Sequence, residues 1–65
     1  MTAYQTILDQ FRMIQIFGRL NDLDSARATI KNLEIIISQV KEDPEVAKNL
    51  PIINKQIGIF EGLCK

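Results

Sequence analysis

The chain has 65 residues, of which 46% are hydrophobic, and its eight basic and eight acidic residues give a net charge of zero. A chain of this length forms at most one domain and buries only about 60% of the surface that its unfolded form exposes. A neutral chain lacks the excess of positive charge that drives nonspecific binding to nucleic acids or anionic membranes.

The usual supports of very small folds are disulfides, metal ions and oligomerisation. With one cysteine, Cys64, and no histidine, the chain cannot form an intrachain disulfide and is poorly equipped for a zinc site. The high hydrophobic content therefore predicts oligomerisation. The longest aliphatic run, Ile35 to Ile37, is far shorter than the ~20 residues that span a bilayer. With no basic leader followed by an apolar block, we expect a cytoplasmic protein without membrane contact, in which Cys64 stays reduced.

The first helix is expected to begin at Thr2, because Thr2 and Gln5 have the spacing of a capping box. It should end near Leu20, before Asn21 and Asp22. Apolar residues at spacings of three and four predict one buried face: Tyr4, Ile7, Leu8, Phe11 and Ile14.

A second helix is expected to be capped by Asp22 or Asp24, since either carboxylate can accept free backbone N–H groups at the helix start. Its apolar residues follow a heptad-like seam that Ile36 widens, which predicts a central helix. The seam consists of Leu23, Ala26, Ile30, Leu33, Ile37 and Val40.

The pair Asp43-Pro44 predicts a third start, with Asp as the cap and Pro at the first helical position. Pro51 disfavours helical geometry in the residue before it and removes a hydrogen bond. We therefore expect a short helix at 44–49, a kink or break, and a last helix from Pro51 to near Leu63. The predicted stripe here is Val46, Leu50, Ile53, Ile57, Phe60 and Cys64.

No segment alternates with the period of a strand, so the sequence predicts an all-α fold in one domain, residues 1–65. Three main helices, the third preceded by a short helical turn and kinked at Pro51, should pack as an antiparallel bundle that oligomerisation completes.

The chain holds more apolar residues than one stripe per helix requires. In the first helix, Met13, Ile16, Phe17 and Leu20 lie roughly opposite the first stripe. In the last helix, Ile52, Ile59 and Leu63 point away from the seam. Scattered exposure, or a kink that turns the first set into the core, would explain them without function. We instead expect interfaces, most simply in a homodimer, because large apolar patches are rare on monomers.

Little in the sequence predicts catalysis. There is no histidine to act as a base near neutral pH, and Cys64 stands next to the last residue with no base expected beside it. The carboxylates occur at helix starts and turns, where capping explains them, and neither a calcium loop nor a phosphate-binding glycine loop is present. We therefore expect no enzyme, no cofactor and no metal.

Four cations suggest a second possibility. Arg12 and Arg19 share one face of the first helix, and Lys48 and Lys55 share one face of the last. Were these faces neighbours, they could form a groove for phosphates, although a solvated charged face is the simpler interpretation. The sequence thus favours a small non-enzymatic binding protein that acts as an adaptor, inhibitor or regulator of another protein. The alternative is an oligomer that binds nucleic acid or an anionic nucleotide-like ligand.

Overall fold

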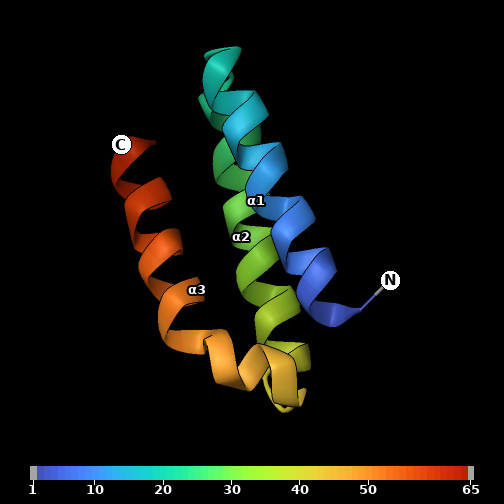
Figure 1. Cartoon of the computed structure of the whole chain (residues 1–65). Helices are drawn as coiled ribbons and strands as arrows, with labels where there is room; N and C mark the ends of the chain where they lie inside the picture. Colours follow the sequence, from blue (N-terminus) through green and yellow to red (C-terminus); the bar gives the residue numbers. More distant parts are fainter. Residues whose placement is uncertain (1, 65) are drawn as a thin grey trace.

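The computed structural model describes residues 2–64, which form three helices: α1 (Ala3–Arg19), α2 (Leu23–Val40) and α3 (Pro44–Leu63). Within these residues there is no strand, so the predicted all-helical fold with three helices is confirmed. Figure 1 shows α1 and α2 side by side, with α3 lying along the pair. The α1–α2 contact is the most extensive, and α3 contacts both partners more loosely.

The capping box predicted for the first helix is present. The Gln5 backbone N–H donates to Thr2 Oγ1 over 3.1 Å, and the Thr2 backbone N–H donates to the Gln5 side chain over 2.9 Å. Each side chain satisfies a backbone donor that the first turn leaves free. The start of α1 is therefore encoded locally, as the sequence indicated.

A tight turn joins α1 to α2. Asn21 adopts a left-handed conformation with φ of 57°, which asparagine tolerates better than most residues. Its N–H donates to the Gly18 carbonyl over 3.1 Å, and the Asp22 N–H donates to the Phe17 carbonyl over 2.9 Å. This pair of bonds is a Schellman motif, which closes the last turn of α1.

Of the two cap candidates for α2, Asp22 is the N-cap. Its carboxylate accepts from the Ser25 hydroxyl over 2.7 Å and from the Ser25 N–H over 3.1 Å. These two hydrogen bonds favour the charged form and lower the pKa of Asp22. Asp24 lies instead in the first turn of the helix.

The third helix differs from the expectation. The sequence predicted a short helix, a kink or break, and a last helix from Pro51, whereas Pro44–Leu63 is one helix that contains Pro51, so a kink and not a break separates its two parts. Asp43 caps it as expected, with Oδ1 accepting from the Glu45 and Val46 N–H groups. Leu50 stays helical despite preceding proline, because tertiary packing can outweigh that local preference. Figure 1 shows α3 changing direction in its first half, where Pro51 has no N–H to donate.

The predicted stripes meet in one core to which every helix contributes. Leu8 departs from the expectation, since 41% of its surface is exposed, and Ile37 and Val40 are only partly buried. The buried set is Ile7, Ile14, Ala26, Ile30, Leu33, Val46, Ile53, Ile57, Phe60 and Cys64.

Substitution of Leu33, which is fully buried, tests this core. We expect Leu33→Ala to lower the free energy of unfolding by about 2–5 kcal/mol, because it removes buried methyl groups and leaves a cavity. Ile35→Ala on the same helix is the control, since Ile35 is 54% exposed and should change stability by less than about 0.5 kcal/mol. Urea unfolding followed by circular dichroism measures both, and equal stabilities of the two variants would show the core assignment to be wrong.

Candidate functional site

Three of the four apolar residues predicted to lie outside the core of α1 do so. Met13, Ile16 and Leu20 are 41%, 46% and 69% exposed. Their spacing of three and four residues places them on one face, and we call these three residues the outer stripe of α1. Phe17 does not belong to it, because its ring is partly buried against the core. At that position the phase of the helix turns the ring toward the other helices.

A second apolar surface lies between α1 and α3. Two adjoining hollows of about 350 and 570 Å³ share Gln15 and Phe60 in their walls, and together they are called the α1–α3 groove. At its base the rings of Phe11 and Phe60 lie 5.7 Å apart at a tilt of 47°, a favourable geometry for two aromatic rings. Its main apolar walls are Tyr4, Leu8 and Phe11 from α1, and Ile52, Phe60 and Leu63 from α3.

The apolar residues of the last helix therefore belong to a different surface from the outer stripe. Ile52 and Leu63 line the α1–α3 groove and are 67% and 71% exposed. Ile59 is 48% exposed and lines none of the hollows described here, although it follows Ile52 by seven residues on the same side of α3. The sequence grouped all these residues as interface candidates without separating the two surfaces.

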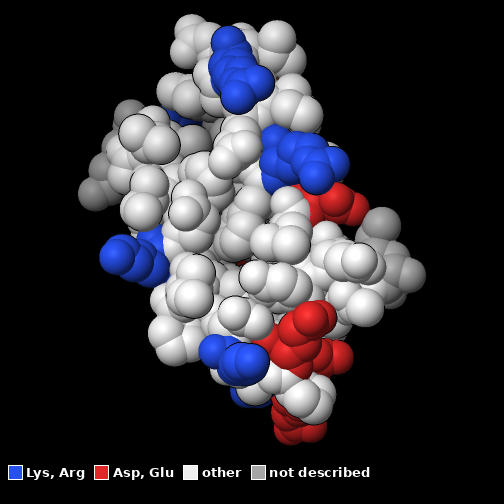
Figure 2. Space-filling view, in the orientation of Figure 1, with Lys and Arg blue, Asp and Glu red and all other residues white. Residues whose placement is uncertain are grey.

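The four cations that the sequence suggested for a phosphate-binding groove are all exposed. Arg12 and Arg19 line different parts of the α1–α3 groove, while Lys48 and Lys55 line no hollow described here. In Figure 2, basic side chains stand at separate places on the face shown, with acidic side chains beside those at the right and at the bottom. No described hollow brings two of the four cations together.

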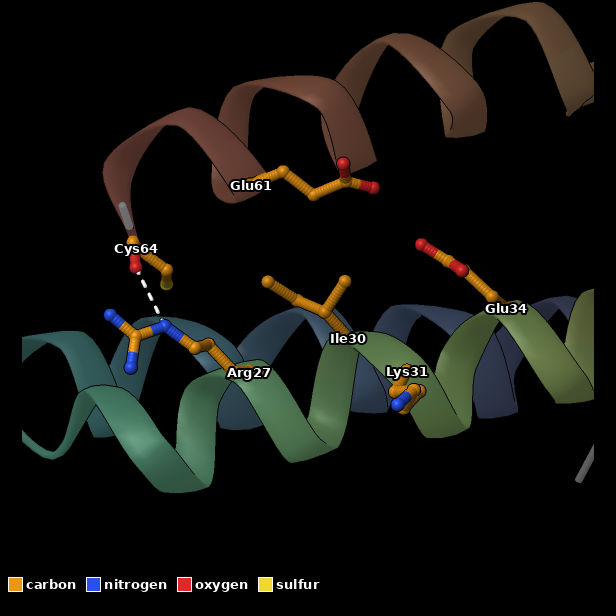
Figure 3. Close-up of a pocket in the computed structure, with 6 residues that line it drawn as sticks. All are labelled: Arg27, Ile30, Lys31, Glu34, Glu61 and Cys64. Carbon is orange, nitrogen blue, oxygen red and sulfur yellow. Dashed lines mark hydrogen bonds between the residues drawn. The ribbon is translucent and has the colours of Figure 1, made fainter.

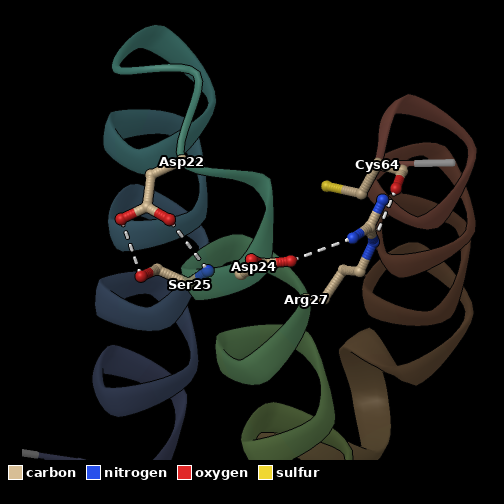
Figure 4. Close-up of polar contacts among 5 residues, drawn as sticks. All are labelled: Asp22, Asp24, Ser25, Arg27 and Cys64. Carbon is tan, nitrogen blue, oxygen red and sulfur yellow. Dashed lines mark hydrogen bonds and ion pairs between the residues drawn. The ribbon is translucent and has the colours of Figure 1, made fainter.

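A third feature, which sequence reasoning missed, lies between α2 and α3. Arg27 Nε donates to the Cys64 carbonyl over 2.8 Å, and its Nη1 pairs with Asp24 Oδ1 over 3.2 Å (Figure 4). The last turn of α3 has no basic residue of its own. Arg27 supplies the positive charge that favours a helix C-terminus, although it belongs to another helix. A local sequence pattern could not predict this contact, because 37 residues separate its partners.

Glu34 and Glu61 extend toward each other across the same region, as Figure 3 shows. A hydrogen bond between the two carboxyl groups, then desolvation and their repulsion, raise the pKa of Glu34, and the nearby Lys31 opposes this only in part. The neighbouring carboxyl group of Glu61 thus disfavours ionisation of Glu34. Because Glu34 is exposed, solvent screening keeps the effect on the packing of α3 against α2 small.

We also searched residues 2–64 for a metal site, a disulfide and a membrane-spanning helix. These residues contain no group of three or more His, Cys, Asp or Glu side chains arranged to hold a metal ion. The thiol of Cys64 is buried and does not form a disulfide. Among the described residues, no helix combines the length and apolarity that crossing a membrane requires.

Comparison with known proteins does not supply a function. No protein-family model matches the chain, and neither the curated proteins nor the solved structures contain a match. The functional argument therefore depends on the surfaces described above.

Removing the Arg27 guanidinium tests its role at the end of α3. We expect Arg27→Ala to lower the free energy of unfolding by about 0.5–1.5 kcal/mol, the usual contribution of a hydrogen bond. Lys31→Ala, one turn along the same face of α2, is the matched control and should cost less. Chemical unfolding of both variants gives the comparison, and a smaller loss for Arg27→Ala than for Lys31→Ala would contradict the assigned role.

The carboxyl pair predicts a specific dependence on pH. Because the pKa of Glu34 is raised in the folded state, the folded protein binds its proton more tightly than the unfolded chain. The favourable contribution is therefore present below the ordinary glutamate pKa and is lost as pH rises through the raised value. We expect Glu34→Gln or Glu61→Gln to raise the melting temperature at neutral pH, with the gain disappearing in acid.

The double variant serves as the control for this prediction. Once one carboxylate is neutral, the second substitution relieves no further repulsion, so the two gains should not add. Thermal unfolding at neutral and acidic pH measures all three variants. Additive gains, or gains that persist in acid, would mean that the two groups do not interact.

Proposed function

We propose that this protein is a small non-enzymatic helical binding protein, an adaptor, inhibitor or regulator that self-associates and acts through protein–protein contacts. The observation that carries the proposal is the outer stripe of α1. Three large apolar side chains share one face and remain 41–69% exposed, although the core of the chain is already filled from other faces. Apolar patches of this kind mark interfaces more often than free surface.

The simplest assembly is a dimer with twofold symmetry, in which the outer stripe of one subunit meets the same stripe of the other. In this proposal the three helices form an antiparallel bundle, and the second copy covers apolar surface that a small domain cannot bury alone. Ile52, Ile59 and Leu63 form a second set of contact residues, which this dimer leaves free for contact with another protein. The proposal places the protein in the cytoplasm, where Cys64 remains a thiol.

Binding of nucleic acid or an anionic small ligand is the second candidate. Its support is that Arg12 and Arg19 line one groove whose described walls include no carboxylate. Against it stands the separation of the cations, because phosphate sites need several donors that converge. Such binding would weaken steeply as salt rises, whereas an apolar protein contact would hardly change.

Sedimentation of charged variants tests self-association. We expect Ile16→Glu to keep the helices formed but to weaken association, because the new carboxylate would be buried without a partner only in the dimer. Ile35→Glu is the matched control, since Ile35 is also exposed but lies on α2, away from the stripe. It should preserve both helicity and mass.

Ile14→Glu provides the opposite contrast on α1. Ile14 is 3% exposed, so a carboxylate there would be buried within each subunit and should unfold the chain. Circular dichroism alongside sedimentation separates the two effects. A wild-type protein that sediments as a 7.4 kDa monomer at micromolar concentration, or Ile16→Glu unfolding as Ile14→Glu does, would refute the proposed dimer.

A further inference from the structure

We propose that the α1–α3 groove binds an acidic amphipathic helix of another protein, which would lie along it as a fourth helix. The inference rests on the proposed function, in which the chain is a binding protein, and it names the kind of partner. It concerns a different surface from the outer stripe. The two ideas can therefore fail separately.

The shape of the groove fits a helix. Its walls along α1 run from Tyr4 to Arg19, a rise of about 22 Å at 1.5 Å per residue. A helix of about fifteen residues covers that length in about four turns. Phe11 and Phe60 supply an apolar base, and the exposed side chains of Ile52 and Leu63 stand beside it. A row of apolar residues on the incoming helix could pack against these side chains.

The charge around the groove defines the flanks of that helix. Among the described wall residues of the two hollows, the only charged side chains are Arg12 and Arg19. They are two turns apart, or about 10 Å. No carboxylate lines these two hollows, but Asp9 lines the adjoining hollow, which shares Leu8 and Arg12 with the groove. The other polar side chains in the groove walls include Gln15 and Gln56.

The opposite margin carries charges of both signs. On α3, Lys48, Ile52, Lys55 and Ile59 recur at spacings of four, three and four, and Glu45 lies on the same stripe seven residues before Ile52. Ile52 in that stripe lines the groove. The positive charge at the groove therefore comes from the two arginines of α1, and it matches a helix with acidic residues beside its apolar seam.

A second copy of this chain does not supply such a helix. Pairing of groove with groove would bring Arg12 and Arg19 toward their own counterparts. The outer stripe is bordered by the same arginines, because Arg12 and Arg19 lie four and three residues from Ile16. Its carboxylate, Asp9, lies only at one end, four residues before Met13. On α2, Ile35 is the large apolar side chain that is exposed, too little for an apolar seam. Charge complementarity therefore favours a foreign, acidic partner.

A designed peptide is a direct probe of the groove. It has about 18 residues, enough for about five turns, with Leu at the seam positions and Glu at both flanking positions. Repulsion between acidic flanks keeps such a peptide from pairing with itself. The control peptide has Lys in place of each Glu. Isothermal titration should show one Glu peptide bound per subunit, with a gain of helicity, and at least tenfold weaker binding of the Lys peptide.

Variants of the groove sharpen the test. Arg12→Gln combined with Arg19→Gln should weaken binding of the Glu peptide about fivefold, as expected for two exposed charge pairs. Replacing both arginines with Glu should abolish the preference for the Glu peptide, because the lysines on α3 remain. Lys31→Gln combined with Lys41→Gln, which removes the same charge from α2, is the matched control and should leave affinity unchanged.

Further variants separate this inference from the proposed dimer. Ile16→Glu should dissociate the dimer but still bind the Glu peptide, which supports the groove as an independent site. Ile52→Glu should keep the helices formed and lose peptide binding. The inference is overturned if both peptides bind equally or if neither binds. It is also overturned if Ile52→Glu abolishes self-association, because that result would place a second copy in the groove. Tighter binding of a single-stranded oligonucleotide than of the Glu peptide would overturn it as well.

Discussion

Asp22 joins the first two helices so closely that the rest of the arrangement follows from it. Its backbone N–H closes α1 by donating to Phe17, and its side chain opens α2 by accepting from Ser25. One residue therefore ends one helix and begins the next, with Asn21 providing the reversal in its left-handed conformation. Such a short connection places α1 directly against α2, and this pair makes the most extensive contact in the chain.

Helix α3 covers the apolar surface that α1 and α2 leave exposed, but it covers that surface incompletely. Ile53, Ile57 and Phe60 reach into the core, while α3 contacts α1 and α2 only loosely. The Phe11–Phe60 contact closes the base of the space between α1 and α3, and the hollows above it remain open. The groove is thus a consequence of how few residues the chain has with which to cover its own apolar surface.

Although the net charge is zero, the charged side chains around α3 are unevenly distributed. Arg27 stabilises the end of a helix that has no cation in its own last turn. Across the same helix pair, the carboxyl group of Glu61 raises the pKa of Glu34. On the other side of α3, the groove has Arg12 and Arg19 in its walls, and Asp9 lines the adjoining hollow. The charge contacts between α2 and α3 and the arginines of the groove therefore lie on opposite sides of α3.

Local chemistry made several features predictable from the sequence: the caps at Thr2 and Asp43, the break around Asn21, and the stripes that became the core. These depend on residues within one or two turns of each other. The sequence did not determine that α3 would continue through Pro51 as one helix, or that Arg27 would reach the end of α3. Those outcomes depend on how the helices pack against each other. Packing between segments far apart in the sequence outweighs local preference and decides which apolar stripes are in contact.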